Sequence, residues 1–302
     1  RLPGLRPQNL FPLMNTLIYW PGRALIALIQ TLPLPLVARL GRAGGGLAFY
    51  LTARYRRVTL DNLTMIFGKE KSPDEIRALA KENFRRLGEN YASAVKTAAM
   101  SFDQLRPHLE FAGLEKFPPN LPDSPHHNIV MAVGHFGNFE LYARIQDIRR
   151  DYQGVTTYRA LKQPAMNRLL QCLRGQNGCL FFERRTEGDK LRELMNRGNA
   201  LLGLLGDQSS RGVRIPLLGH DCNTGVSPAV FALRYNARLF EVICYRTALA
   251  RWRIECGDEI PTHENGRPRT SEAIMRDVNR AYEQAIRRDP ANWSWVHRRR
   301  KN

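Results

Sequence analysis

An unbroken run of five apolar residues, Ile129 to Val133, ends at Gly134 and is followed by His135. A strand without a polar face must be covered on both sides, which is typical of the centre of a parallel sheet. Such sheets bind ligands outside the carboxyl ends of their strands, so His135 is expected at the mouth of a crevice. The run therefore predicts an α/β fold with a central, mostly parallel sheet flanked by helices.

The residues after this run indicate acid-base chemistry. Asn138 is a good helix cap, and a helix that begins after it carries Glu140 in its first turn. From there the carboxylate can reach back to the His135 imidazole and fix its tautomer, with the other ring nitrogen facing a substrate. A satisfied polar histidine is the plainer interpretation, and the rest of the chain has to decide between the two.

Strands and helices alternate downstream, with strands expected at 154–158, 179–182 and 200–205 and helices at 164–174 and 189–197. Polar residues follow two of these strands: Arg159 comes after the first, and Asp207 and Gln208 come after the third. Because the carboxyl ends of parallel strands share one edge, we expect these side chains to converge with His135 on one crevice.

Two further helices have clear signals. Ser72, Pro73 and Glu75 form a capping box in front of an amphipathic helix expected over 72–99. A terminal helix is expected over 271–287. Neither helix carries a candidate catalytic residue.

The amino-terminal part is apolar. Residues 11–38 contain a single charge, Arg23, and have the length of a spanning helix, but Pro21, Pro33 and Pro35 interrupt them. An anchor that dips into one leaflet, or spans with a break, is therefore expected, and the basic residues that follow suggest a cytoplasmic domain. The alternative is one or two buried core helices. We expect residues 1–50 to form a membrane-anchoring helical segment and 51–302 the main domain.

The net charge of +18, from 46 basic and 28 acidic residues, favours an anionic partner. Nucleic acid, an anionic membrane and a phosphorylated or acidic ligand all fit. The basic residues are spread along the chain without a nucleic-acid-binding motif, so no nucleic-acid partner is expected. The five cysteines have no metal-ligand spacing, so reduced thiols and no metal site are expected.

Taken in order, these segments resemble the bacterial lipid A biosynthesis late acyltransferases, the lauroyl and myristoyl transferases of the lysophospholipid acyltransferase superfamily. The resemblance runs nearly end to end. It rests on the apolar amino terminus, Asn62-Leu63, the block from Gly134 to Glu140, Tyr158-Arg159, Asp207-Gln208 and the closing Trp295 to Arg299. The chain departs from the family pattern at Ala160 and Gly206, where proline is usual, and at Leu217 to Gly219, where an aromatic pair is usual.

The resemblance implies an enzyme with a His-x4-Glu active site at His135 and Glu140. It implies transfer of a fatty acyl chain from an acyl carrier protein, or CoA, thioester to a hydroxyl of a lipid A precursor or similar glycolipid, without a further cofactor. It places the protein on the cytoplasmic face of the inner membrane, among anionic lipids. It also assigns an active-site arginine of the family to Arg174, if the family pattern is matched to this sequence with a gap of one residue. The departures from the family pattern do not change the expected reaction, but they make the identity of the acceptor lipid less specific.

The chemistry also follows from the residues. A thioester needs only a base for the acceptor hydroxyl, donors for the oxyanion and a site that holds both substrates. His135 supplies the base, and the oxyanion donors are expected among the backbone amides of the Gly134 or Gly137 turn with Arg174 nearby. The remaining expected substrate contacts are Arg159, Arg174, Asn138, Asp207 and Gln208. Arg159 and Arg174 suit substrate phosphates equally well, and Asp207 could position an arginine or the acceptor hydroxyl, or merely close its strand.

Three alternatives stand beside this reading. A serine hydrolase would need G-x-S-x-G, and residues 225–229 lack the final glycine. An acyltransferase that acts on another membrane lipid would need the same groups. A membrane-bound lipid-binding protein without catalysis would keep the apolar and basic segments but would have no use for a His135 and Glu140 pair.

Overall fold

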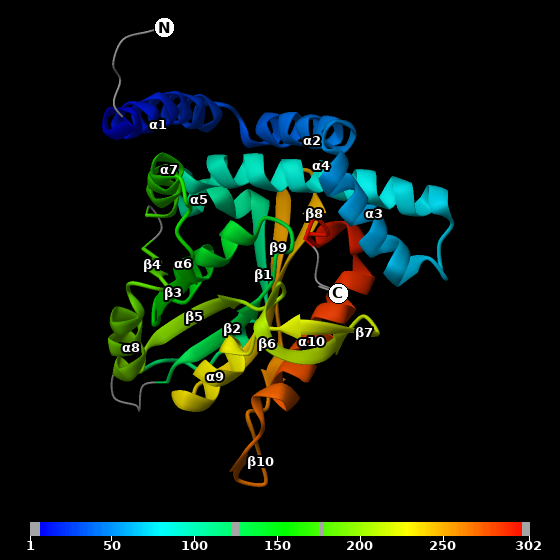
Figure 1. Cartoon of the computed structure of the whole chain (residues 1–302). Helices are drawn as coiled ribbons and strands as arrows, with labels where there is room; N and C mark the ends of the chain where they lie inside the picture. Colours follow the sequence, from blue (N-terminus) through cyan, green and yellow to red (C-terminus); the bar gives the residue numbers. More distant parts are fainter. Residues whose placement is uncertain (1–6, 122–126, 176–177, 298–302) are drawn as a thin grey trace, which may run out of the picture.

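The computed structural model describes residues 7–121, 127–175 and 178–297. Its centre is a seven-stranded sheet (Figure 1). The strands, in spatial order, are β1 (Leu109–Ala112), β9 (Arg251–Ile260), β8 (Arg238–Ala248), β2 (Ile129–Val133), β5 (Ala200–Leu205), β3 (Gln153–Tyr158) and β4 (Leu180–Glu183). Strands β8, β2, β5, β3 and β4 run parallel, whereas β9 is antiparallel to β8. The predicted mostly parallel sheet is confirmed.

Strand β2 lies between β5 and β8, and all five of its residues are buried. Val130 and Ala132 belong to one apolar cluster, and Ile129, Met131 and Val133 belong to a second. Successive side chains of a strand point to opposite faces, so the two clusters lie on the two faces of the sheet. The unbroken apolar run is explained, because neither face of β2 meets water.

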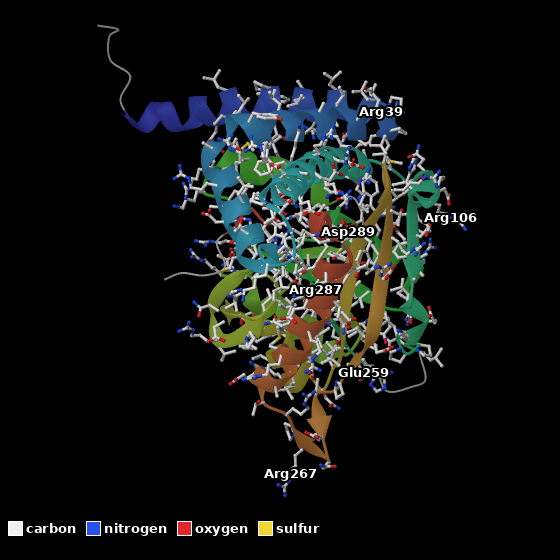
Figure 2. The ribbon with its side chains drawn as sticks, turned by 90° about the vertical axis from the view of Figure 1, so that its right-hand side faces the viewer. Arg39, Arg106, Glu259, Arg267, Arg287 and Asp289 are labelled. Atoms are coloured by element: carbon white, nitrogen blue, oxygen red, sulfur yellow. The ribbon has the colours of Figure 1, made fainter. Side chains whose placement is uncertain are left out.

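Helices cover both faces. The first cluster includes residues of α8 (Gly188–Arg197), α9 (Ser227–Arg234) and α10 (Ser271–Arg288) together with the β6–β7 hairpin (Ser209–Leu217 and His220–Thr224). The second includes residues of η3 (Phe139–Arg144) and α6 (Ile145–Ile148). Shorter elements complete this part: α5 (Phe102–Leu105), η1 (Arg106–His108), η2 (Leu114–Lys116), α7 (Pro164–Arg174) and η4 (Pro290–Asn292). A small hairpin, β10 (His263–Glu264) with β11 (Arg267–Pro268), projects from the sheet with Arg267 at its tip (Figure 2).

Helix α4 (Pro73–Ala98) begins at the predicted capping box. The Ser72 hydroxyl accepts from the Glu75 amide at 3.3 Å, and the Glu75 carboxylate accepts from the Ser72 amide at 2.8 Å. Two of the backbone amides at the helix start are thereby satisfied. The helix lies between the sheet and the amino-terminal helices (Figure 1).

The apolar amino-terminal part forms α1 (Pro7–Thr31) and α2 (Leu34–Leu51), with a break at Pro33, followed by α3 (Ala53–Phe67). Helix α2 touches α4 through glycines: a Cβ on Gly45 would lie 2.1 Å from the Phe84 carbonyl oxygen, and one on Gly88 would lie 2.2 Å from that of Gly41. Only residues without a side chain allow this backbone contact. Helix α2 is therefore packed into the fold, and the predicted boundary between residues 50 and 51 lies at its carboxyl end.

None of the helices in the described part of the chain combines the length and the hydropathy that crossing a membrane requires. The outer side of α1 and α2 nevertheless exposes large apolar side chains. They are Leu17, Trp20, Leu25, Leu28, Leu36, Leu40 and Leu47.

Candidate active site

A cavity of about 1370 Å³ opens at the carboxyl ends of the parallel strands. Five of the side chains predicted from the sequence line it: His135, Glu140, Arg159, Arg174 and Gln208. They come from the segments after β2, β3 and β5 and from the end of α7. Arg159 and Gln208 thus meet His135 at one crevice, as expected, whereas Asp207 lies buried behind His135 and does not line the cavity.

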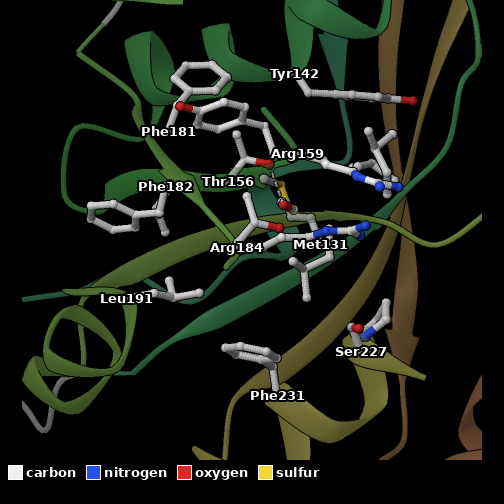
Figure 3. A pocket seen from close by; sticks show the side chains of 18 of the residues that line it. Met131, Tyr142, Thr156, Arg159, Phe181, Phe182, Arg184, Leu191, Ser227 and Phe231 are labelled. Atoms are coloured by element: carbon white, nitrogen blue, oxygen red, sulfur yellow. Dashed lines mark hydrogen bonds between the residues drawn. The ribbon is translucent and has the colours of Figure 1, made fainter. Parts of the chain in front are cut away.

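One side of this cavity is apolar and the other is basic. Figure 3 shows Phe181 and Phe182 on one side with Phe231 below them, whereas Arg159 and Arg184 extend toward the other side. Arg159 and Arg184 are both exposed to solvent. The cavity can therefore hold a hydrocarbon chain on one side and an anionic group on the other.

The imidazole of His135 is held by Asp207. The Nδ1 atom lies 2.8 Å from Oδ1 of Asp207, and the backbone amide of His135 donates to Oδ2 at 2.9 Å. Asp207 is 1% exposed and does not line the cavity. A carboxylate only accepts, so Nδ1 carries the proton and the lone pair of Nε2 remains for a substrate. The Nε2 atom of Gln208 lies 3.2 Å from His135 Nε2, where its N–H can occupy that lone pair.

Two glycines make this arrangement possible. A Cβ on Gly134 would lie 2.6 Å from the Phe136 ring and 3.2 Å from Cβ of Asp207, so its absence lets β5 deliver Asp207 against His135. Gly137 has a φ of 52° and would place a Cβ 2.6 Å from the Cys244 carbonyl oxygen. A side chain at either position would displace the turn that carries His135.

The predicted hydrogen bond between Glu140 and His135 is wrong. Glu140 instead forms a bidentate ion pair with Arg174, at 2.5 Å from Oε1 to Nη2 and 3.0 Å from Oε2 to Nε. The guanidinium carries several N–H donors and a permanent charge, in a planar geometry that matches a carboxylate. The Nδ1 atom of His135 is already hydrogen-bonded to Asp207 and is not available to Glu140. Glu140 thus orients an arginine in the cavity.

The helix after Asn138 differs from the prediction as well. It is the 3-10 helix η3, and Asn138 occupies its N-cap position without a side-chain cap hydrogen bond. Asn138 is 1% exposed and is not one of the cavity-lining residues. The structure therefore does not bring Asn138 to the position of a substrate contact.

One expected oxyanion donor is already engaged. The amide of Gly137 donates to the Asn292 carbonyl at 3.0 Å, and a backbone N–H has a single proton to give. The N–H donors that line the cavity include the side chains of Gln208, Arg174 and Arg159. The Gly137 amide is therefore not available as the expected oxyanion donor.

Besides the phenylalanines and Arg184, the site involves Trp293 and Cys179, which were also not among the predicted site residues. Trp293 donates its indole N–H to Oδ2 of Asp207 at 2.8 Å. Cys179 lines the cavity, and burial raises the pKa of its thiol to about 12, with the nearby Glu140 carboxylate adding to the shift. Trp293 belongs to an aromatic segment that stands out in the sequence, but the position of Trp293 in the sequence does not indicate a contact with Asp207.

Comparison with known proteins shows the family of the chain. The family model of the bacterial lipid A biosynthesis acyltransferases matches residues 8–302. A relative from Haemophilus influenzae, described as a lipid A biosynthesis acyltransferase, is 27% identical over 169 residues, which are 55% of this chain and 51% of that protein. The alignment thus spans about half of the relative's length. Because the family model covers almost the whole chain, the protein belongs to the bacterial lipid A biosynthesis acyltransferase family.

Proposed function

We propose that the protein is a membrane-associated acyltransferase. It moves a fatty acyl chain from a thioester of acyl carrier protein, or of CoA, to a hydroxyl of a lipid A precursor or similar glycolipid. The observation that carries this proposal is His135, hydrogen-bonded through Nδ1 to the buried Asp207, in a cavity with one apolar and one basic side. A base, a hydrocarbon site and anion-binding groups are what an acyl transfer between two amphiphiles requires.

The reaction needs one proton transfer to His135 and one proton transfer from it. Nε2 of His135 takes the proton of the acceptor hydroxyl as its oxygen attacks the thioester carbonyl, and Asp207 stabilises the imidazolium that forms. The tetrahedral intermediate then collapses: the C–S bond breaks, the new C–O ester bond remains, and the imidazolium returns the proton to the departing thiolate. The acceptor displaces the Gln208 amide from the Nε2 lone pair.

The oxyanion of the intermediate requires donors in the cavity. Gln208 lies next to the reacting nitrogen of His135 and is freed when the acceptor binds. Arg174, held by Glu140, adds a positive charge in the same cavity. Arg159 is exposed at the end of β3 and suits a phosphate group of either substrate. In this scheme Glu140 contributes through Arg174.

Two possible nucleophiles in the cavity do not fit an acyl-enzyme. Cys179, with a pKa of about 12, is a neutral thiol at physiological pH. Ser227 lines the cavity, but the described side-chain hydrogen bonds of the His135 ring go to Asp207 and Gln208. A serine nucleophile would have to be hydrogen-bonded to its base. Direct transfer to the acceptor hydroxyl is therefore the mechanism that we propose.

The outer face of α1 and α2 supports binding to a membrane surface. Trp20, Leu28 and Leu47 are 64%, 59% and 58% exposed, so this face presents apolar area to the surroundings. Arg39 lies exposed on the same layer (Figure 2). A helix pair with apolar side chains outward and basic residues beside them suits the interface of an anionic bilayer. In this position the protein can receive a lipid acceptor from the membrane.

A vesicle experiment tests this surface. The triple variant Trp20→Glu, Leu28→Glu, Leu47→Glu should lower the partition coefficient on phosphatidylglycerol vesicles by at least about 100-fold, because burying each apolar side chain contributes roughly 1.5–3 kcal/mol. The matched control is Ile148→Glu, which changes an exposed apolar residue of α6. If co-sedimentation of the triple variant equals that of the control, the membrane-binding surface lies elsewhere.

A transfer assay tests the proposed function. The purified chain is mixed with a radiolabelled acyl thioester, presented on acyl carrier protein or on CoA, and with a lipid A precursor in mixed micelles, and the products are separated and weighed by mass spectrometry. We expect an acceptor heavier by one acyl group, formed with release of one free thiol. Binding of both lipids without such a product would instead favour the non-catalytic lipid-binding alternative.

A further inference from the structure

The carboxy-terminal segment 292–295 runs along the turn that carries His135. Trp293 forms an antiparallel bridge with Phe136, the amide of Ser294 donates to the His135 carbonyl at 3.2 Å, and the amide of Gly137 donates to the Asn292 carbonyl at 3.0 Å. The backbone on both sides of His135 is thus bonded to a segment that follows it by more than 150 residues in the sequence.

Trp293 links this segment to the buried carboxylate. Its indole N–H donates to Oδ2 of Asp207 at 2.8 Å, while Oδ1 faces Nδ1 of His135 at 2.8 Å. The backbone amide of His135 also donates to Oδ2. Trp293 is 5% exposed and does not line the cavity, so it can influence the reaction only through other residues.

The backbone segment that carries the indole is itself held in place by other elements. The side-chain amide of Asn83, in α4, donates to the carbonyl of Trp293 at 2.6 Å and to that of Ala291 at 3.0 Å. The side chain of Asn292 donates to the Cys244 carbonyl at 2.9 Å and accepts from the Arg246 amide at 3.2 Å. These contacts tie the segment to α4 and β8. The backbone from which the indole projects is therefore held by the fold.

We propose that Trp293 is a positioning residue for acyl transfer. Its hydrogen bond to Oδ2 sets the plane of the Asp207 carboxylate, so that Oδ1 accepts the Nδ1 proton of His135 and Nε2 faces the cavity. This inference rests on the proposed function. Without the indole donor the carboxylate keeps its hydrogen bond from the His135 amide but is held less firmly about its terminal bond, and the imidazole then spends part of its time in the wrong tautomer or orientation.

Trp295 offers a matched control in the same segment. Its indole N–H donates to the Pro290 carbonyl at 2.7 Å, it is 2% exposed, and its ring centroid lies 4.6 Å from that of Trp293. Both tryptophans thus lose a buried indole hydrogen bond and similar volume when replaced by phenylalanine. Only one of those bonds reaches the His135 and Asp207 pair.

The experiment compares Trp293→Phe with Trp295→Phe by steady-state kinetics and thermal unfolding. We expect both variants to lose stability, but only Trp293→Phe to lower kcat, by about 10- to 100-fold, since hydrogen bonds to charged groups contribute that much. Its KM should stay unchanged because Trp293 does not touch the cavity. If Trp293→Phe is too unstable to assay, replacing Trp293 with 3-benzothienylalanine keeps the ring shape and removes only the N–H.

A double variant separates positioning from general packing. In an Asp207→Asn background, Trp293→Phe should cause little further loss of kcat, because its effect passes through Asp207. Equal kcat values for Trp293→Phe and Trp295→Phe, or an undiminished effect in the Asp207→Asn background, would overturn this inference. Neither outcome would touch the proposed function, which fails instead if His135→Ala retains normal turnover.

Discussion

A His135→Ala protein is expected to lose acyl transfer by a factor on the order of 10² to 10⁴ while it keeps its fold, because general base catalysis usually contributes that much. The side chain is 16% exposed at the cavity and lies after the end of β2, outside the two apolar clusters. Its removal therefore deletes the base without opening a void in the core. Initial rates with a labelled acyl thioester, together with thermal unfolding, measure the two effects separately.

His108→Ala is a suitable control for this variant. His108 is partly buried and its Nδ1 atom lies 2.9 Å from the Ala250 carbonyl oxygen, but it lies outside the cavity. Its substitution should leave turnover near the wild-type value. Near-normal turnover of a folded His135→Ala protein would remove the catalytic role of this residue altogether, and the function would then have to rest on another base in the cavity.

Replacing Asp207 with asparagine should cost about 10³- to 10⁴-fold in kcat, close to the effect of losing the base, because the amide can donate to Nδ1 and favour the wrong imidazole tautomer. Glu140→Gln should cost less, about 10-fold, because it weakens the grip on Arg174 and leaves His135 and Asp207 in place. Both substitutions preserve side-chain shape. Measuring kcat of both variants under identical conditions shows which of the two carboxylates contributes more to turnover.

Combined variants make this comparison sharper. His135→Ala with Asp207→Asn should be little worse than the slower single variant, because residues that act as one unit are not additive. Glu140→Gln with Arg174→Gln should behave in the same way for the second pair. If Glu140→Gln is instead as slow as His135→Ala and Asp207→Asn is nearly normal, the imidazole partner during turnover is Glu140, as the His-x4-Glu spacing suggested.

Local sequence predicted the frame of this protein well. Strand β5 and helix α7 have the bounds expected from the sequence, and the capping box of α4 forms as its residues indicated. These features depend on interactions over a few residues, such as alternation, apolar runs and helix caps. The β6–β7 hairpin was missed because its two-residue turn uses Leu218 at a φ of 52° before Gly219, and leucine rarely signals such a turn.

The sequence by itself also predicted that the segments after β2, β3 and β5 meet at one crevice, because strands of one parallel sheet bring their carboxyl ends to one edge whatever the details of packing. Only the tertiary structure decided which residues there bond to each other. Glu140 is near His135 in the sequence, but Asp207 is 72 residues away from it and Trp293 a further 86. The choice of partner depends on inter-element packing: the missing side chain of Gly134 admits Asp207, and the end of α7 offers Arg174 to Glu140. Hydrogen bonds require placement within a few tenths of an ångström, which the spacing of residues along a chain cannot specify.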